Sequence, residues 1–112
     1  MRSFIVAILC LLAPAVAGAG TSAKGKPYSL LFTNDGRVVF WSTGAHAGRP
    51  SCAADDRWVI NTYDLRGQGI LAGLMMAYAS GKNIVIQGTG ICEGWEGESV
   101  QYFFTVDAPE TL

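Results

Sequence analysis

Short runs of β-prone residues, separated by turn residues, fill most of the chain. Residues 28–33 and 37–42 are two such runs, rich in aromatic and β-branched side chains, and they flank Asn34-Asp35-Gly36. Two runs of this kind around an Asn/Asp/Gly turn predict a β-hairpin. The same pattern predicts further strands at residues 57–62, 83–88 and 100–106.

One stretch changes to a helical period. Leu71, Leu74, Met75 and Tyr78 are spaced as i, i+3, i+4 and i+7, which is one face of a helix. We expect this helix between residues 64 and 80, with Asp64 as its N-cap residue. Gly81 occupies the position where a left-handed residue ends a helix.

The predicted order is therefore three strands, one helix and two strands. This order is typical of the OB-fold, a five-stranded, partly open barrel. A small α+β sandwich, with one helix across an antiparallel sheet, is the alternative. We place the single domain at residues 28–107, with a flexible leader at 18–27 and a loose tail at 108–112.

The N-terminus has the layout of a secretory signal peptide. Arg2 precedes an apolar run over residues 4–16, and Ala15-Val16-Ala17 fits a small-x-small cleavage site. The run is shorter than the roughly 20 residues needed to cross a bilayer, so we do not expect a membrane span. We interpret residues 1–17 as a signal peptide and predict a periplasmic or secreted protein.

Composition narrows the class of protein further. Removing residues 1–17 of the 112 leaves 95 residues with seven Lys/Arg and nine Asp/Glu, a net charge of −2. That length allows one domain. The acidic balance argues against nucleic acid as a partner, because nucleic-acid-binding domains carry a basic surface.

Cys52 and Cys92 remain after the signal peptide, since Cys10 lies within it. In an exported chain an even pair favours a disulfide, which here would close a loop of about 40 residues. A metal site would need more ligands than two cysteines and one histidine. The 39 residues between the two cysteines also disfavour a redox C-x-x-C pair.

Few residues are candidates for chemistry. His46 is the only histidine and lies near Arg49 in a loop rich in glycine. Both are candidate contacts for a ligand or partner, although a solvated loop histidine is the simpler interpretation. The acidic residues Asp55, Asp56, Glu93, Glu96 and Glu98 lack the spacing of a calcium loop, and acidic loops are usually just solvated.

Trp95 is the strongest candidate for binding. It lies between Gly94 and Gly97 in an acidic loop, where an aromatic ring can stack on a sugar or anchor a partner. The alternative is that Trp95 folds back over the open end of the barrel. Trp41 and Trp58 lie within predicted strands and are interpreted as core or wall residues.

The helix carries apolar residues on more than one side. Ile70, Met76 and Ala77 lie outside the stripe of Leu71 and Leu74. A helix that is apolar nearly all round usually has a second partner. We therefore treat these three residues as a candidate interface of a homo-oligomer.

Part of the chain resembles a known family. The resemblance is carried by Cys52, Trp58, residues 70–82, 84–86 and 88–92, Trp95 and residues 98–100. These segments resemble small exported bacterial proteins similar to the B subunits of AB5 toxins, of the subtilase cytotoxin B type. The resemblance implies an OB-fold, a disulfide and a ring of five subunits that binds glycans, but it assigns no sugar-contacting residue here.

Together these observations favour binding over catalysis. We expect an exported, non-catalytic binding module without a metal or cofactor, recognising a glycan or a protein. The alternative is an inhibitor or structural interaction protein, secreted or in the envelope, that uses residues 92–99 as its contact. A small hydrolase built on His46 is the weakest hypothesis.

Overall fold

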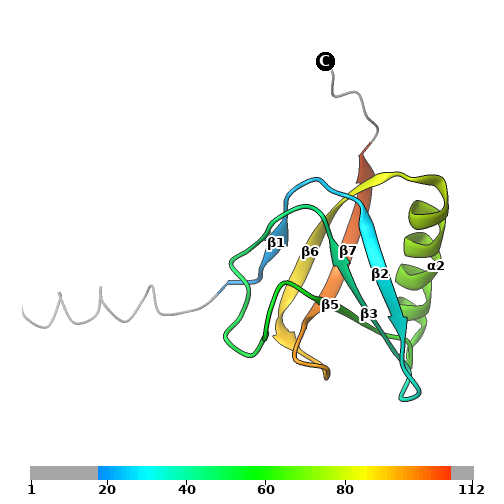
Figure 1. Cartoon of the computed structure of the whole chain (residues 1–112). Helices are drawn as coiled ribbons and strands as arrows, with labels where there is room; N and C mark the ends of the chain where they lie inside the picture. Colours follow the sequence, from blue (N-terminus) through cyan, green and yellow to red (C-terminus); the bar gives the residue numbers. More distant parts are fainter. Residues whose placement is uncertain (1–17, 107–112) are drawn as a thin grey trace, which may run out of the picture.

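The computed structural model describes residues 18–106, which form a curled sheet of seven strands and one helix (Figure 1). The sheet has the order β2-β3-β5-β7-β6-β1-β4. Its pairings are antiparallel except that of β5 with β7, which is parallel. The elements are β1 (Thr21–Ser22), β2 (Pro27–Phe32), β3 (Arg37–Ser42), β4 (His46–Ala47), β5 (Trp58–Asn61), α2 (Leu65–Ser80), β6 (Asn83–Cys92) and β7 (Glu98–Val106).

The predicted hairpin is confirmed. β2 and β3 pair in antiparallel register, with Phe32 opposite Val38. Thr33 N–H donates to Arg37 O at 2.9 Å across the turn. Gly36 has φ +79°, a conformation that favours glycine. The turn residues therefore direct the chain back along β2.

Helix α2 begins and ends where the capping residues predict. The Asp64 side chain accepts a hydrogen bond from Gly67 N–H at 2.8 Å, and Gly81 follows the helix with φ +70°. Gly67 also permits a close approach, because a Cβ there would lie 1.7 Å from Asn61 O. The glycine therefore lets the helix start directly against the end of β5.

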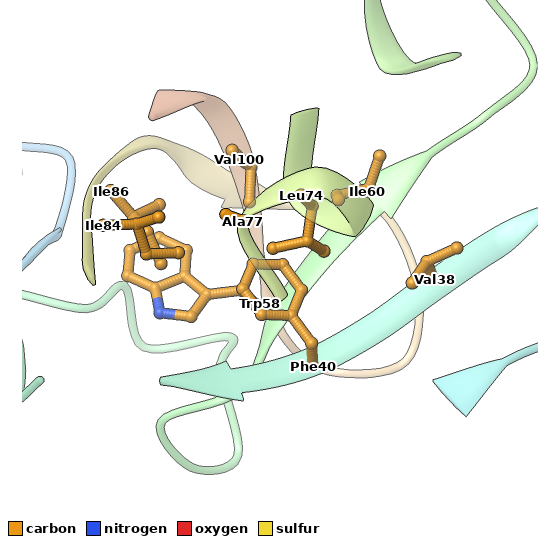
Figure 2. Packing of buried hydrophobic residues seen from close by; sticks show 9 residues of the cluster. All are labelled: Val38, Phe40, Trp58, Ile60, Leu74, Ala77, Ile84, Ile86 and Val100. Carbon is orange, nitrogen blue, oxygen red and sulfur yellow. The ribbon is translucent and has the colours of Figure 1, made fainter. Parts of the chain in front are cut away.

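The core lies between α2 and the sheet (Figure 2). Leu74 and Ala77 from the helix are fully buried in the same cluster as Trp58 of β5. Of the predicted stripe only Leu71 and Leu74 face the core, whereas Met75 and Tyr78 are exposed, so that half of the stripe is wrong. Burying a large apolar side chain contributes about 1.5–3 kcal/mol. The remaining members of the cluster are Val38, Phe40, Ile60, Ile84, Ile86 and Val100.

The sheet differs from the predicted five strands. β1 and β4 add two short strands, taken from the expected leader and from the loop after β3. Within the expected leader, Thr21 and Ser22 thus pair with β4 and β6, Gly25 pairs with Ile84, and Pro27 begins β2. Strands of two residues have no apolar alternation, so periodicity cannot reveal them. The fold class is mainly β with one helix and a mixed, half-barrel sheet.

The predicted disulfide is present. Cys52 and Cys92 are joined, with their Cα atoms 6.2 Å apart. In the chain-entropy model a loop of this length stabilises the fold by about 4 kcal/mol. The bond attaches the loop after β4 to the end of β6.

Two predicted segments, the signal peptide at 1–17 and the tail at 108–112, lie outside the described residues. Within residues 18–106, no helix is long and apolar enough to cross a membrane.

Candidate functional site

Trp95 lies at the surface, in the loop between β6 and β7. Its indole Nε1–H is 3.2 Å and 3.1 Å from the two carboxylate oxygens of Asp35, in the turn of the β2–β3 hairpin. The residue keeps 41% of its surface exposed. Its backbone has φ +56°, and Gly94 before it has φ +110°. The loop therefore presents the ring at the turn while leaving much of it accessible.

Asp35 is held in place by several donors. The Thr33 hydroxyl bonds to its carboxylate, and Arg37 Nη1 lies 3.8 Å from it. The hydrogen bond from the Thr33 hydroxyl is the main cause that holds the pKa of Asp35 below its usual value; burial opposes it, and the Trp95 indole and the Arg37 guanidinium lower the pKa further. Asp35 therefore remains a carboxylate over the neutral range.

Tyr63 completes this group of side chains. A Cβ on Gly36 would lie 2.8 Å from the Tyr63 ring, so the ring packs directly on the turn glycine. The Arg37 guanidinium carbon lies 5.7 Å from the centre of the same ring. Tyr63 is 69% exposed. We call Asp35, Arg37, Tyr63 and Trp95 the hairpin-tip cluster.

Two arginine side chains hold the Trp95 loop through hydrogen bonds to its backbone. Arg37 Nε donates to Glu93 O at 2.6 Å, and Arg57 Nη1 donates to Trp95 O at 3.1 Å. Arg57 is itself bound by both carboxylate oxygens of Asp55, at 2.8 and 3.0 Å. Hydrogen bonding to Arg57 lowers the pKa of Asp55 to about 2. The loop that carries Trp95 is therefore anchored at two backbone carbonyls.

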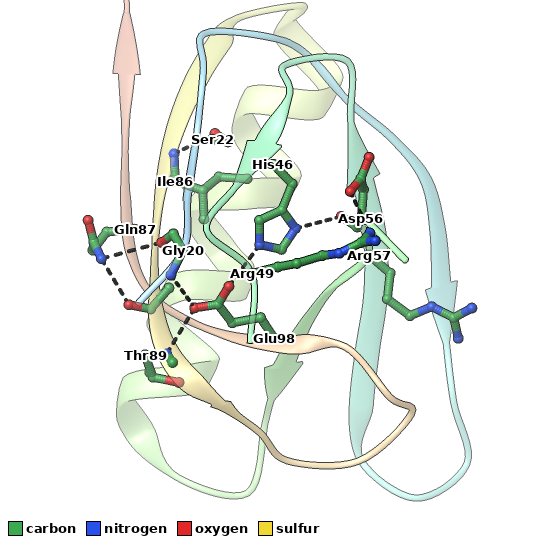
Figure 3. Close-up of polar contacts among 12 residues, drawn as sticks. Gly20, Ser22, His46, Arg49, Asp56, Arg57, Ile86, Gln87, Thr89 and Glu98 are labelled. Atoms are coloured by element: carbon green, nitrogen blue, oxygen red, sulfur yellow. Dashed lines mark hydrogen bonds and ion pairs between the residues drawn. The ribbon is translucent and has the colours of Figure 1, made fainter. Parts of the chain in front are cut away.

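Arg49 and His46 do not join this cluster. Arg49 pairs with Asp56, with Nη1 2.8 Å from Oδ1, and remains partly exposed. The His46 side chain is fully buried, 2.8 Å from the Glu98 carboxylate (Figure 3). The interpretation of His46 as a solvated loop residue is wrong, and a ligand on the surface cannot reach it.

The three candidate interface residues of the helix divide between core and surface. Ala77 is fully buried in the core, so it is wrongly placed in an interface. Ile70 packs against the core and also lines a surface groove, and Met76 is 52% exposed. The groove has a volume of about 450 Å³ and is lined by Leu65, Arg66, Gly69, Ile70, Gly73, Met76 and residues 102–105 of β7.

The acidic residues do not assemble into a metal site. Among residues 18–106, no group of three His, Cys, Asp or Glu side chains is placed to hold a metal ion. Glu98 is buried, whereas Glu93 accepts a hydrogen bond from Ser99 Oγ at 2.8 Å. The acidic loop thus contributes structural hydrogen bonds to its own strands.

Sequence reasoning missed half of the hairpin-tip cluster. It identified Trp95, and it used Asp35 only as a turn residue. Tyr63 and Arg37 carry no signal in the sequence, because the contact of Tyr63 with the turn depends on the pairing of β3 with β5, and Arg37 binds the Trp95 loop through the distant Glu93 O.

Comparison of the chain with protein-family models, with curated proteins and with solved structures finds no match.

Proposed function

We propose that this chain is an exported, non-catalytic binding module that recognises a glycan through the hairpin-tip cluster. The observation that carries the proposal is the Trp95 ring, which is bonded to Asp35 at one edge and exposed over much of its surface. Tryptophan and tyrosine rings combine a large apolar face with a polar handle, as binding sites at the protein surface require. A sugar presents both an apolar C–H face and hydroxyl groups.

The chemistry of the cluster fits these two sides of a sugar. The rings of Trp95 and Tyr63 offer apolar faces, and the Asp35 carboxylate can accept hydrogen bonds from hydroxyl groups. Arg37 supplies donors from the same turn. The anchored loop reduces the side-chain ordering that binding would otherwise cost, at about 0.5–1.5 kcal/mol for each immobilised side chain.

Export and the finer fold class belong to the same proposal. The predicted signal peptide and the disulfide together favour a periplasmic or secreted location. The order of β2, β3, β5, α2, β6 and β7 keeps the strand-helix-strand sequence of an OB-fold. We infer an OB-like barrel that is widened at one edge by β1 and β4, similar to toxin B subunits.

The test is a glycan array probed with the chain from Gly18 onward. We expect the Trp95→Ala variant to bind its glycan at least tenfold more weakly, a loss of about 1.4 kcal/mol. Tyr102→Ala is the matched control, because Tyr102 is an exposed aromatic residue on β7 outside the cluster. Absence of any glycan signal, or equal losses in both variants, would refute recognition by the cluster.

A second candidate function is assembly, either as a homo-oligomer or as a structural or inhibitory partner of another protein. β5 pairs with β7 only at Glu98 and Ser99, and no other strand of residues 18–106 pairs with that side of β7. The apolar groove beside α2 follows this unpaired edge, and Phe104 next to it is 52% exposed. Exposed apolar patches beside strand edges favour association.

Size-exclusion chromatography with light scattering tests the homo-oligomer. We expect Met76→Lys to shift the mass towards the monomer and Trp95→Ala to leave it unchanged. A monomer at tens of micromolar for the unmodified chain would remove this candidate, and glycan binding would stand separately.

A further inference from the structure

His46 and Glu98 form a buried cluster that joins distant segments (Figure 3). Glu98 Oε2 accepts hydrogen bonds from Gly20 N–H at 2.8 Å and Gly90 N–H at 2.9 Å. Its other oxygen, Oε1, lies 2.8 Å from His46 Nε2. Both side chains have no exposed surface. One carboxylate thereby ties the chain before β1, strand β4 and strand β6 to β7.

The hydrogen-bond partners determine how many protons this pair holds. His46 Nδ1 lies 3.0 Å from the backbone oxygen of Asp56, which can only accept, so Nδ1 carries a proton. A second proton must lie between Nε2 and Glu98 Oε1, because two lone pairs would repel at 2.8 Å. The pair thus holds one proton more than a neutral imidazole and a carboxylate. Its net charge is zero.

The carboxylates of the loop before β5 are paired with arginine side chains. The Asp56 carboxylate is directed to Arg49 and is largely exposed. On the same loop, Asp55 is bound to Arg57. From β5, Trp58 stacks on the His46 ring with centroids 3.7 Å apart, a contact that favours a positively charged ring. The bound proton is therefore the counter-charge of Glu98.

The residue before β1 and strand β6 approach the carboxylate with backbone alone. A Cβ on Gly20 would lie 2.3 Å from Glu98 Oε1, and one on Gly88 would lie 2.1 Å from Oε2. Glycine at both positions lets the two segments close around the carboxylate. Water is thus kept out, and a net charge left in this space would be costly.

We propose that the His46–Glu98 pair is a pH-sensitive latch, which holds the β1–β4 edge on the sheet through one bound proton. β1 and β4 have two residues each, and they pair with each other at the end of the sheet. The latch adds to the few hydrogen bonds that attach so short an edge to β6, such as those of Ser22 and Gly25. Edges of this kind open locally without unfolding of the core.

The sign of the pH dependence follows from the proton count. The closed latch holds one proton on the pair. In the opened state, a free histidine loses its proton above about pH 6.5 and a free glutamate gains one below about pH 4.3. The closed state therefore holds more protons above about pH 6.5 and fewer below about pH 4.3. The latch is most secure between these values and weakens on both sides.

Hydrogen exchange measured by NMR from pH 4 to pH 9 tests the proposal. The quantities compared are the protection factors of the Gly20, Ala23 and Gly90 N–H groups. A protection factor is corrected for the base-catalysed rate of exchange in an unfolded chain, which itself changes with pH. We expect them to be constant between about pH 4.3 and 6.5 and to fall tenfold per pH unit above that range, the slope of one linked proton. Constant protection factors from pH 5 to pH 9 would overturn the latch.

Glu98→Gln is the matched variant. The glutamine oxygen can still accept from Gly20 and Gly90, and its amide can donate to a neutral His46 ring. The closed state of this variant then holds no extra proton, so its protection factors should fall below about pH 6.5 and stay constant above it. A merely structural role for Glu98 would give the same pH profile in both proteins, and that result would overturn the proposal.

The single histidine of the chain supplies a readout that does not depend on the variant folding. Nitrogen-15 NMR of the imidazole reports directly which ring nitrogens carry protons. At pH 7 we expect protonation at Nδ1 and a proton shared with Glu98 at Nε2. An unprotonated Nε2 at pH 7 in the folded chain would contradict the latch, whatever Glu98→Gln does.

Discussion

Replacing glycine by alanine should have opposite effects at two positions in this fold. At Gly88, in β6, the added Cβ would lie 2.1 Å from Glu98 Oε2 and 2.9 Å from Trp58 Cζ3. Neither neighbour can move aside easily, since both are fully buried. At Gly69, on the exposed side of α2, the same Cβ meets no atom within 4 Å. The two variants therefore compare one methyl group in a closed and an open environment.

The two variants should change the free energy of unfolding in opposite directions. In Gly88→Ala the carboxylate must leave its place and gives up its amide donors and its contact with His46. Breaking a buried, hydrogen-bonded ion pair costs about 3–5 kcal/mol. In Gly69→Ala the helix gains about 1 kcal/mol, because alanine loses less backbone entropy than glycine.

Urea unfolding under oxidising conditions measures both effects. With a slope near 1 kcal/mol per molar urea, typical of a small domain, the midpoint should fall by about 3–5 M in Gly88→Ala. It should rise by about 1 M in Gly69→Ala. If the free energy of unfolding of Gly88→Ala lay within about 1 kcal/mol of that of the unmodified chain, the Glu98 carboxylate would not be enclosed. That result would contradict the buried His46–Glu98 pair.

Two further predictions concern the loop that follows β4. Replacing both Cys52 and Cys92 by serine should lower the free energy of unfolding by about 4 kcal/mol, as measured by urea unfolding, and an unchanged midpoint would contradict the loop-closure argument. Asp55 has its pKa lowered to about 2 by Arg57, so the pair stabilises the fold above about pH 4 and this contribution disappears as the pH falls towards 2. Because both side chains are partly exposed, the effect should be below about 1 kcal/mol. Thermal melts of Asp55→Asn should therefore approach those of the unmodified chain near pH 2, and a constant difference across that range would refute the assignment.

Local signals in the sequence were sufficient for part of the fold. The hairpin turn at residues 34–36, the Asp64 cap and Gly81 each depend on neighbours within a few positions. The disulfide followed from the number of cysteines and the expected compartment. These features need no knowledge of strand order.

The features that sequence reasoning missed depend on distant partners. Glu98 lies in an acidic, glycine-rich region, where a carboxylate is usually solvated, yet its partners Gly20 and His46 are 78 and 52 positions away. Burial of Glu98 is favourable only when those segments meet. Tyr63 is similar, because its place beside Gly36 depends on the pairing of β3 with β5.

The position of β7 in the sheet has a consequence for folding. β7 is synthesised after the other strands of residues 18–106, yet it lies between β5 and β6 and joins them. Until it emerges, the chain can form β2–β3–β5 as one assembly and β6 with β1 and β4 as another, with no strand between them. Insertion of a final central strand is a long-range step, of the kind that slows the folding of β-rich domains. Both cysteines precede β7, so early oxidation can link the two assemblies and leave the gap that β7 then fills.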